Sequence, residues 1–198
     1  GSTDLAAAML TGKLWFKVPP TMRLELQGKL QEGVYSKDVA LFLAGEITAD
    51  GATYLAVEYG GEVIDSLSVE ARFTISNMAV EMGAKAGLME ADEKTMAWLE
   101  GRVTRSCAPA APDPDADYAE VRECDLGGLT PQVAEPHRVD NARPVEEVEG
   151  TLIQEAVIGT CTNGRLEDLE VAARILAGRR VSPEVRLIVA PASRQVLM

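Results

Sequence analysis

Alternation of apolar and polar positions predicts strands in the first third of the chain. Residues 22–28 alternate along their whole length, which is typical of a strand with one buried face. Residues 53–59 give a second strand pattern, and the turn signal Asp50-Gly51 precedes it. We also expect a short strand over residues 14–18, ended by two prolines.

Helical spacing alternates with these strands. It predicts helices over residues 3–10, 36–45, 69–84 and 92–99. Gly12 is expected to end the first helix. Ser36 and Ser68 are expected to be N-caps, because a serine hydroxyl accepts a hydrogen bond from a free backbone N–H in the first turn.

The predicted helix over residues 69–84 has two distinct faces. Its apolar stripe consists of Ile75, Met78, Ala79 and Met82. Its polar stripe consists of Glu70, Thr74, Asn77 and Glu81. Two interpretations of the polar stripe stay open. It is either a solvated face, or a face that points Asn77 and Glu81, one turn apart, into a cleft.

The pattern changes after residue 100. Residues 108–117 are rich in Pro, Ala and Asp and predict a linker or mobile loop, and only residues 118–124 suggest a strand before the last quarter. A strand ending at Ile158, a helix over residues 165–176 and a strand over residues 186–190 then follow. This order is typical of a βαβ unit with parallel strands, so the chain is expected to have an α/β fold.

Cys161 is the strongest candidate for chemistry. It lies in a Gly-rich loop between the strand ending at Ile158 and the helix starting near Arg165. Backbone N–H groups and the helix dipole at such a position favour a thiolate. The residues leave three roles open for Cys161, namely a nucleophile, a metal ligand or a buried thiol, because no CxxC accompanies it.

The other candidate residues favour structural roles. Cys107 lies in the expected linker and reads as an exposed thiol, whereas Cys124 ends a strand and reads as a buried one. His137 is the only histidine and follows Pro136 in a loop, where a hydrogen-bonded residue is favoured over a ligand. Three widely spaced cysteines argue against a disulfide framework and fit a reducing cytoplasm.

Charge and hydropathy exclude two classes of partner. The 198 residues carry a net charge of −12, which argues against nucleic acid bound through its phosphates. No apolar stretch approaches the roughly 18 residues that span a membrane, so no membrane partner is expected. The helical pattern begins at once and the last helix stops without a cap, so we expect an internal piece of a longer protein.

Several segments, taken together, resemble one known family. They are 1–4 (GSTD), 12–19 (GKLWFKVP), 50–54 (DGATY), 74–87 (TISNMAVEMGAKAG), 131–137 (PQVAEPH), 158–165 (IGTCTNGR) and 191–194 (PASR). In this order they resemble the large subunit of 3-isopropylmalate dehydratase, in the aconitase superfamily. The resemblance covers nearly the whole chain except residues 108–117.

The resemblance implies a cofactor and roles for four residues. The family holds a [4Fe-4S] cluster by three cysteines, and Cys161 matches the first of them. Asn163 follows in the same motif and is expected to contact the cofactor. Asn77 and Glu81 match polar residues that approach the cluster and its bound water, where a carboxylate accepts or donates the hydroxyl proton.

The resemblance also implies what this chain lacks. The family's other two cluster cysteines form a CxxC beyond the matching region, its histidine-rich segments precede it, and its catalytic serine lies on a small swivelling subunit. We therefore expect the intact protein to interconvert 2- and 3-isopropylmalate in leucine biosynthesis, with the small subunit as partner and a small hydroxy acid as substrate. We expect this chain alone to bind no stable cluster and to be inactive.

Two alternative functions stay open. One alternative is a homoaconitase or another small-malate hydro-lyase, and the other is a non-catalytic scaffold or assembly module. By resemblance, the fold consists of pieces of three-layer, Rossmann-like α/β subdomains. We expect residues 1–33 to be the tail of a first subdomain, 34–100 a compact subdomain, 101–148 a linker region, and 149–198 the start of a third subdomain.

Overall fold

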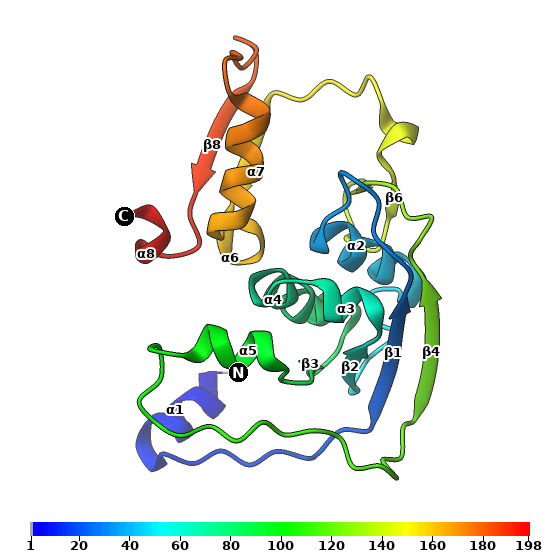
Figure 1. Cartoon of the computed structure of the whole chain (residues 1–198), viewed down its shortest axis with the longest axis vertical. Helices are drawn as coiled ribbons and strands as arrows, with labels where there is room; N and C mark the ends of the chain where they lie inside the picture. Colours follow the sequence, from blue (N-terminus) through cyan, green and yellow to red (C-terminus); the bar gives the residue numbers. More distant parts are fainter. Residues whose placement is uncertain (1) are drawn as a thin grey trace.

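Strand β1 (Thr21–Gln27) lies inside a parallel four-stranded sheet. The computed structural model describes residues 2–198 and is drawn in Figure 1. The strand order is β3-β2-β1-β4, with β2 at Ala56–Gly60, β3 at Ala86–Met89 and β4 at Glu120–Asp125. All three pairings are parallel, which confirms the predicted α/β class.

The alternation along β1 separates an apolar face from a charged one. Met22, Leu24 and Leu26 are fully buried, which confirms the predicted strand with one buried face. Three helices lie on that side of the sheet in Figure 1, namely α2 (Ser36–Ile47), α3 (Glu62–Ser66) and α4 (Val69–Met78). The opposite face carries Arg23, which forms ion pairs with Glu25 and Glu58.

The apolar stripe predicted for α4 is buried, with Ile75 in the main core of the sheet and Met78 in a smaller cluster beside α2. Ile75 and Met78 are almost fully buried, and so are Ala79 and Met82 in the 3₁₀ turn η1 (Ala79–Met82) that continues the helix. The Ser68 hydroxyl accepts a hydrogen bond of 3.0 Å from the Ala71 N–H, so the predicted N-cap is confirmed. The α-helical part ends before residue 84 because the chain tightens into η1.

The structure corrects three predictions in the first third of the chain. Residues 14–18 form no strand, because they pair with no neighbouring strand, and the ladder starts only at Thr21 after the two prolines. Ser36 is the first helical residue of α2 rather than its N-cap, which is Tyr35. The Asp38 carboxylate accepts a hydrogen bond of 2.7 Å from the Tyr35 N–H. Gly45 does not end this helix, which continues to Ile47.

The segment after residue 100 contains more structure than predicted. Besides β4, it has an antiparallel pair, β5 (Gln132–Ala134) and β6 (Ala142–Pro144), and a 3₁₀ turn η2 (Val145–Val148). Three-residue strands are too short for a visible alternation, which is why the sequence did not reveal them. Residues 108–117 form an exposed loop without helix or strand.

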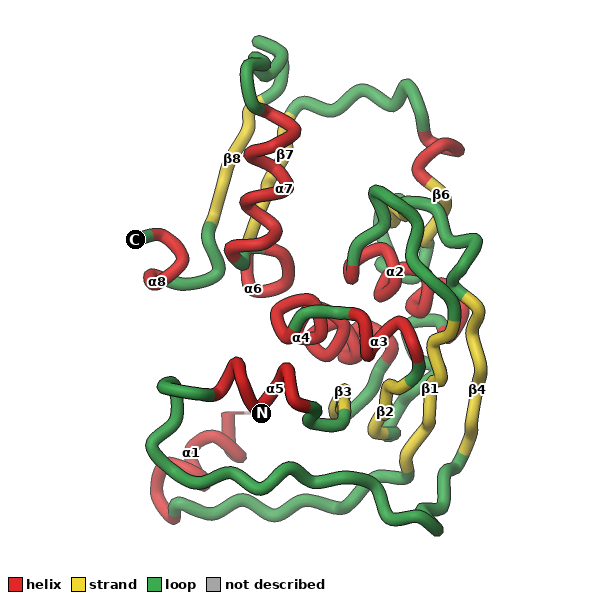
Figure 2. The backbone as a smooth tube through the Cα atoms, viewed as in Figure 1, coloured by secondary structure: helices red, strands yellow, loops and turns green. Residues whose placement is uncertain are grey.

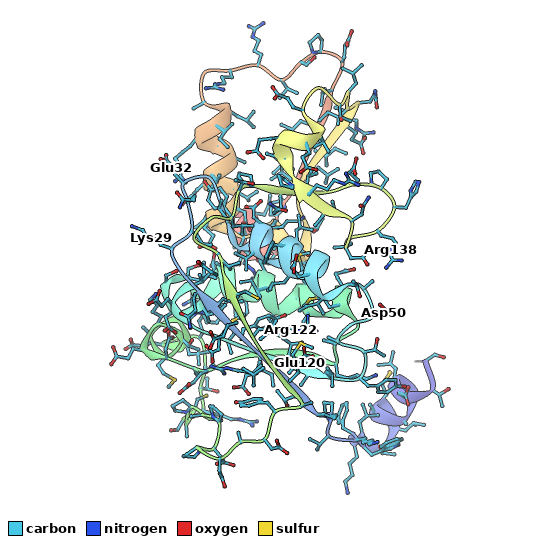
Figure 3. All side chains as sticks on the ribbon, turned by 90° about the vertical axis from the view of Figure 1, so that its right-hand side faces the viewer. Lys29, Glu32, Asp50, Glu120, Arg122 and Arg138 are labelled. Carbon is cyan, nitrogen blue, oxygen red and sulfur yellow. The ribbon has the colours of Figure 1, made fainter. Side chains whose placement is uncertain are left out.

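The hydrogen-bonded sheet crosses the subdomain boundaries that we expected. β1 belongs to residues 1–33, β2 and β3 to residues 34–100, and β4 to residues 101–148. Because all four are neighbours in one sheet, these three segments share a core. Figure 3 shows the β4 side of this sheet, where Glu120 and Arg122 form an exposed ion pair of 2.5 Å.

The last quarter of the chain forms the predicted βαβ unit. Strand β7 (Glu155–Gly159) pairs in parallel with β8 (Arg186–Ala190), and α7 (Leu166–Leu176) connects them after the short helix α6 (Thr160–Asn163). Figure 2 shows the loop that leads from β6 to this unit. The unit packs against the rest of the chain where α6 contacts α4.

Two short helices lie towards the ends of the chain. They are α1 (Ser2–Thr11), with Gly12 at φ 64° directly after it as predicted, and α8 (Arg194–Leu197). The predicted helix near residue 92 is α5 (Glu93–Leu99), capped by Asp92. Gly1, which opens the first of the matching segments, lies outside the described residues. No helix within residues 2–198 is long and apolar enough to cross a membrane.

Candidate functional site

Cys161 lies in helix α6, directly after the carboxyl end of β7 and before the start of α7. This confirms the predicted place of the residue between a strand and a helix, although the short helix α6 was not foreseen. The thiol is exposed, and the Thr162 Oγ1 lies 4.0 Å from its sulfur. We use "the Cys161 loop" below for residues 159–165.

Two glycines give the Cys161 loop its shape. Gly159 has a φ of 132°, and a Cβ atom there would lie 1.9 Å from the Ala190 carbonyl oxygen. A Cβ atom on Gly164 would lie 2.6 Å from the Thr160 oxygen and 2.7 Å from the Ala192 nitrogen. The Ala192 N–H donates a hydrogen bond of 2.7 Å to the Gly164 carbonyl. The two glycines therefore let the loop pack tightly against the end of β8.

The polar stripe of α4 meets this loop. Thr74 is 1% exposed, and its Oγ1 donates a hydrogen bond of 2.7 Å to the Thr162 carbonyl oxygen. The Asn77 Nδ2 donates a bond of 2.9 Å to the Thr162 Oγ1. Of the two interpretations of the stripe, the solvated face is therefore wrong for Thr74, whereas Asn77 is exposed and makes this one bond to the loop. No sequence pattern indicates that Thr162 is their shared partner.

Asp168 fixes the other side of the loop. Its Oδ1 accepts a hydrogen bond of 3.0 Å from the Asn163 Nδ2, and its Oδ2 accepts one of 3.0 Å from the Arg165 N–H. The Asn163 Oδ1 is buried and has no partner among the described residues. Asp168 was missed at the sequence level, although an acidic residue three positions after a helix N-cap is a recognisable capping signal.

A cleft of about 660 Å³ opens beside the loop. Its walls come from α2, α4 with η1, β5 and the β7–α7 unit. Glu81, Thr162 and Asn163 line it together with Lys37 and Asp38. The structure thus brings two of the expected site residues, Glu81 and Asn163, to one cleft. Cys161 and Asn77 do not line it, although both adjoin Thr162, which does.

A second contact joins the start of α7 to the start of α4. The Ser68 Oγ donates a hydrogen bond of 2.7 Å to the Glu167 Oε2. Burial raises the pKa of the Glu167 carboxyl, and the nearby Glu70 and Asp168 add to this, whereas the Ser68 bond and Arg165 lower it. The Arg165 guanidinium lies 4.7 Å from the Phe73 ring centroid.

The remaining candidates lie away from the cleft. Cys107 is exposed, as predicted. Cys124 is half-buried in β4, and burial together with Glu46 raises the pKa of its thiol. His137 is exposed in the loop between β5 and β6. The predicted burial of Cys124 is therefore only partly met, because β4 is an edge strand.

The described residues do not amount to a complete iron–sulfur site. Within residues 2–198, no three His, Cys, Asp or Glu side chains gather where they can hold a metal ion. The loop offers one thiol, whereas a [4Fe-4S] cluster is normally held by several cysteine thiolates. Cys161 therefore fits the part of a single ligand and not that of a whole binding site.

The aconitase family model (aconitate hydratase) matches residues 1–152 and 144–198. The chain belongs to the aconitase family. The match covers both the sheet with its helices and the unit that carries Cys161, so both parts of the cleft belong to the matched region. The resemblance seen in the sequence motifs is thereby confirmed.

Similar proteins of this family are large subunits. The chain is 55% identical to "3-isopropylmalate dehydratase large subunit 1" of Methanopyrus kandleri, over 99% of this chain and 47% of that protein. It is 52% identical to the 3-isopropylmalate dehydratase large subunit of Moorella thermoacetica, over 99% of this chain and 47% of that protein. It is also 52% identical to a probable methanogen homoaconitase large subunit of Methanosarcina mazei, over 100% of this chain and 50% of that protein. The chain thus spans about half the length of these relatives.

Proposed function

We propose that this chain is part of the large subunit of a hydro-lyase that interconverts 2- and 3-isopropylmalate. The observation that carries the proposal is the identity of 52–55% with 3-isopropylmalate dehydratase large subunits over 99% of the chain. The reaction removes a hydroxyl group and a proton next to a carboxylate, and then adds water back with the opposite placement. It is a step of leucine biosynthesis in the cytoplasm.

The cleft supplies groups that suit this chemistry. Glu81 lines the cleft from η1, where its carboxylate can take or return the proton of the substrate hydroxyl. Asn163 lines the same cleft, and Asp168 orients its amide through the hydrogen bond from Nδ2. Lys37 also lines the cleft and can pair with one carboxylate of the substrate, beside the carboxylates of Asp38, Glu81 and Asp168 in the same wall.

The cluster belongs to the intact protein in this proposal. Cys161 would be one of its ligands, and the remaining ligands would come from residues beyond this chain. When bound, the cluster supplies a Lewis-acidic iron for the departing hydroxyl. Asn77 contributes by holding Thr162, the residue after Cys161, in place.

Homoaconitase activity is the second candidate. Two relatives with that name, from Methanosarcina mazei and Methanothermobacter thermautotrophicus, are 52% and 50% identical to this chain over 100% of its length. These values lie close to those of the dehydratases. The small subunit is the expected partner in both cases, since the relatives are named large subunits.

A substrate comparison tests the proposal. A large subunit of full length that contains this chain is purified with its small subunit and assayed on 2-isopropylmalate and on homocitrate. Dehydration gives a conjugated double bond whose ultraviolet absorbance reports turnover. We expect kcat/KM to be at least about tenfold higher for 2-isopropylmalate, a difference of about 1.4 kcal/mol in transition-state binding. The reverse ratio favours the homoaconitase, and inactivity on both substrates favours the non-catalytic scaffold.

A further inference from the structure

Thr162 receives two hydrogen bonds from helix α4. The Thr74 Oγ1 donates to its carbonyl oxygen at 2.7 Å, and the Asn77 Nδ2 donates to its Oγ1 at 2.9 Å. Thr74 and Asn77 are three residues apart, so they lie on the same helix face. Both the backbone and the side chain of the residue after Cys161 are thus held by an element that lies far away in the sequence.

The hydroxyl of Thr74 is used in an unusual way for a helix. A threonine inside a helix commonly bonds a carbonyl of its own preceding turn. Thr74 instead donates to a residue 88 positions further along the chain, although it is only 1% exposed. A buried hydroxyl without a partner is costly, so the Cys161 loop and Thr74 satisfy each other.

We propose that Thr74 is a positioning residue, which fixes the Cys161 thiol through the backbone of Thr162. Gly164 anchors the far end of the loop by accepting the hydrogen bond from the Ala192 N–H. Thr74 holds the end of the loop near the sulfur through its hydrogen bond to the Thr162 carbonyl oxygen. The use of Cys161 as a ligand rests on the proposed function, but the anchoring itself does not and is tested without any activity measurement.

Hydrogen exchange of the 198-residue chain provides the first test. Thr74→Val keeps the shape of the side chain and removes the hydroxyl, whereas Thr74→Ser keeps the hydroxyl. We expect amides of the Cys161 loop to exchange about tenfold faster in Thr74→Val, as the loss of roughly one hydrogen bond implies. We expect Thr74→Ser to stay within about twofold of the parent, and β1 to be unchanged in both variants.

A spin label on Cys161 provides the second test. Its mobility would not change if Thr74 only stabilised the fold. The label is attached in a Cys107→Ser, Cys124→Ala background. We expect its rotational correlation time to fall roughly twofold in Thr74→Val and to recover in Thr74→Ser. A label on Cys107, in a background that lacks the other two cysteines, should not respond. Unchanged loop exchange and label mobility in Thr74→Val would overturn the proposal.

A third variant covers the case in which Thr74→Val also loses protection in β1. Thr74→Ala and Thr74→Ser both lack the γ-methyl group, and only Thr74→Ala lacks the hydroxyl. The ratio of the exchange rate in the Cys161 loop to the exchange rate in β1 should then be at least about threefold higher in Thr74→Ala than in Thr74→Ser. Equal ratios in the two variants would show that the hydroxyl does not hold the loop.

Discussion

Arg72 of α4 and Asp92 at the N-cap of α5 form an ion pair across the edge of the core. Arg72 is 5% exposed, and its Nε also donates a hydrogen bond of 3.1 Å to the Ile64 carbonyl. Asp92 in addition accepts a bond of 2.9 Å from the Thr95 N–H. One carboxylate thus both neutralises a buried guanidinium and caps a helix.

Replacement of this carboxylate should destabilise the chain. We expect Asp92→Asn to lower the free energy of unfolding by about 1.5–3 kcal/mol, because a charged hydrogen bond to buried Arg72 is lost. Urea denaturation measures the change. Glu93→Gln is the control, since Glu93 is the exposed neighbour, and it should change stability by less than about 0.5 kcal/mol. Equal effects of the two variants would contradict a specific role of the ion pair.

The same pair implies a dependence on pH. The Arg72 guanidinium holds the pKa of the Asp92 carboxyl well below its usual range. A lowered pKa in the folded state means that Asp92 contributes stability above its ordinary pKa of 3.8, which is lost as the pH falls below it. The stability difference between the parent chain and Asp92→Asn should therefore shrink in acid. A difference that stays constant from pH 6 to pH 3 would contradict this assignment.

Glu167 should show the opposite dependence. Burial raises the pKa of its carboxyl above the ordinary value of 4.5, so ionisation costs the folded state more than the unfolded state. Stability from this group is fully present below pH 4.5 and is lost as the pH rises through the raised pKa. Glu167→Gln keeps an acceptor for Ser68 and stays neutral. We expect its Tm to exceed that of the parent at pH 7 and to approach it near pH 4.5.

The net charge of −12 makes a control necessary for this comparison, because removal of any negative charge reduces repulsion. Glu170→Gln removes the same charge from an exposed position on the same helix. The Tm gain of Glu167→Gln over Glu170→Gln at pH 7 is the quantity to measure. If Glu170→Gln gives the same gain, burial of Glu167 is not the cause.

Two glycines in the connections of the βαβ unit offer a test of steric fit. Gly159 and Gly178 both have positive φ, but only Gly159 has a backbone atom within contact distance of an added Cβ atom. Gly178→Ala should cost about 1 kcal/mol from backbone strain alone. Gly159→Ala should cost at least about 2 kcal/mol more, because the Ala190 carbonyl must move. Chemical denaturation compares the two, and equal losses would show that the loop adapts without cost.

Local patterns predicted those elements that are long enough to show one buried and one polar face. The alternation of residues 22–28 and the apolar stripe of α4 each reflect burial of one face, so their strand and helix assignments were confirmed. Residues 14–18 have a similar apolar character, but strand formation requires a partner, and none is present. Strands β5 and β6 are too short to leave a pattern.

The candidate site was predicted only in part for a related reason. The Gly-rich loop after β7 revealed Cys161, because strand, glycine and helix signals are adjacent in the sequence. The bonds from Thr74 and Asn77 to Thr162 join residues that are 88 and 85 positions apart. Such a contact depends on how two units pack together, and neither segment shows it alone. The roles of Glu81, Asn77, Asn163 and Cys161 remain predictions.

Iron binding by the chain alone is a direct test of the single-ligand proposal. We expect reconstitution of the 198-residue chain with iron and sulfide to give no stable charge-transfer absorbance, because the Cys161 loop offers one thiol. The same treatment of the full-length large subunit should give a cluster, and Cys161→Ser should abolish it. A brown, iron-containing preparation of the short chain would show that its own residues suffice. A full-length Cys161→Ser protein with an intact cluster would remove Cys161 from the ligand set.

Glu81 allows a separate test of the catalytic proposal in the full-length large subunit with its small subunit. Glu81→Gln keeps the size of the side chain that lines the cleft and removes its capacity to accept a proton. We expect kcat to fall by about 10²–10⁴ with the cluster absorbance unchanged. Glu70→Gln is the control, because Glu70 belongs to the same polar stripe but does not line the cleft. Comparable activity in the two variants would exclude Glu81 as the group that transfers the hydroxyl proton, whereas a lost cluster in Glu81→Gln would point to a structural role.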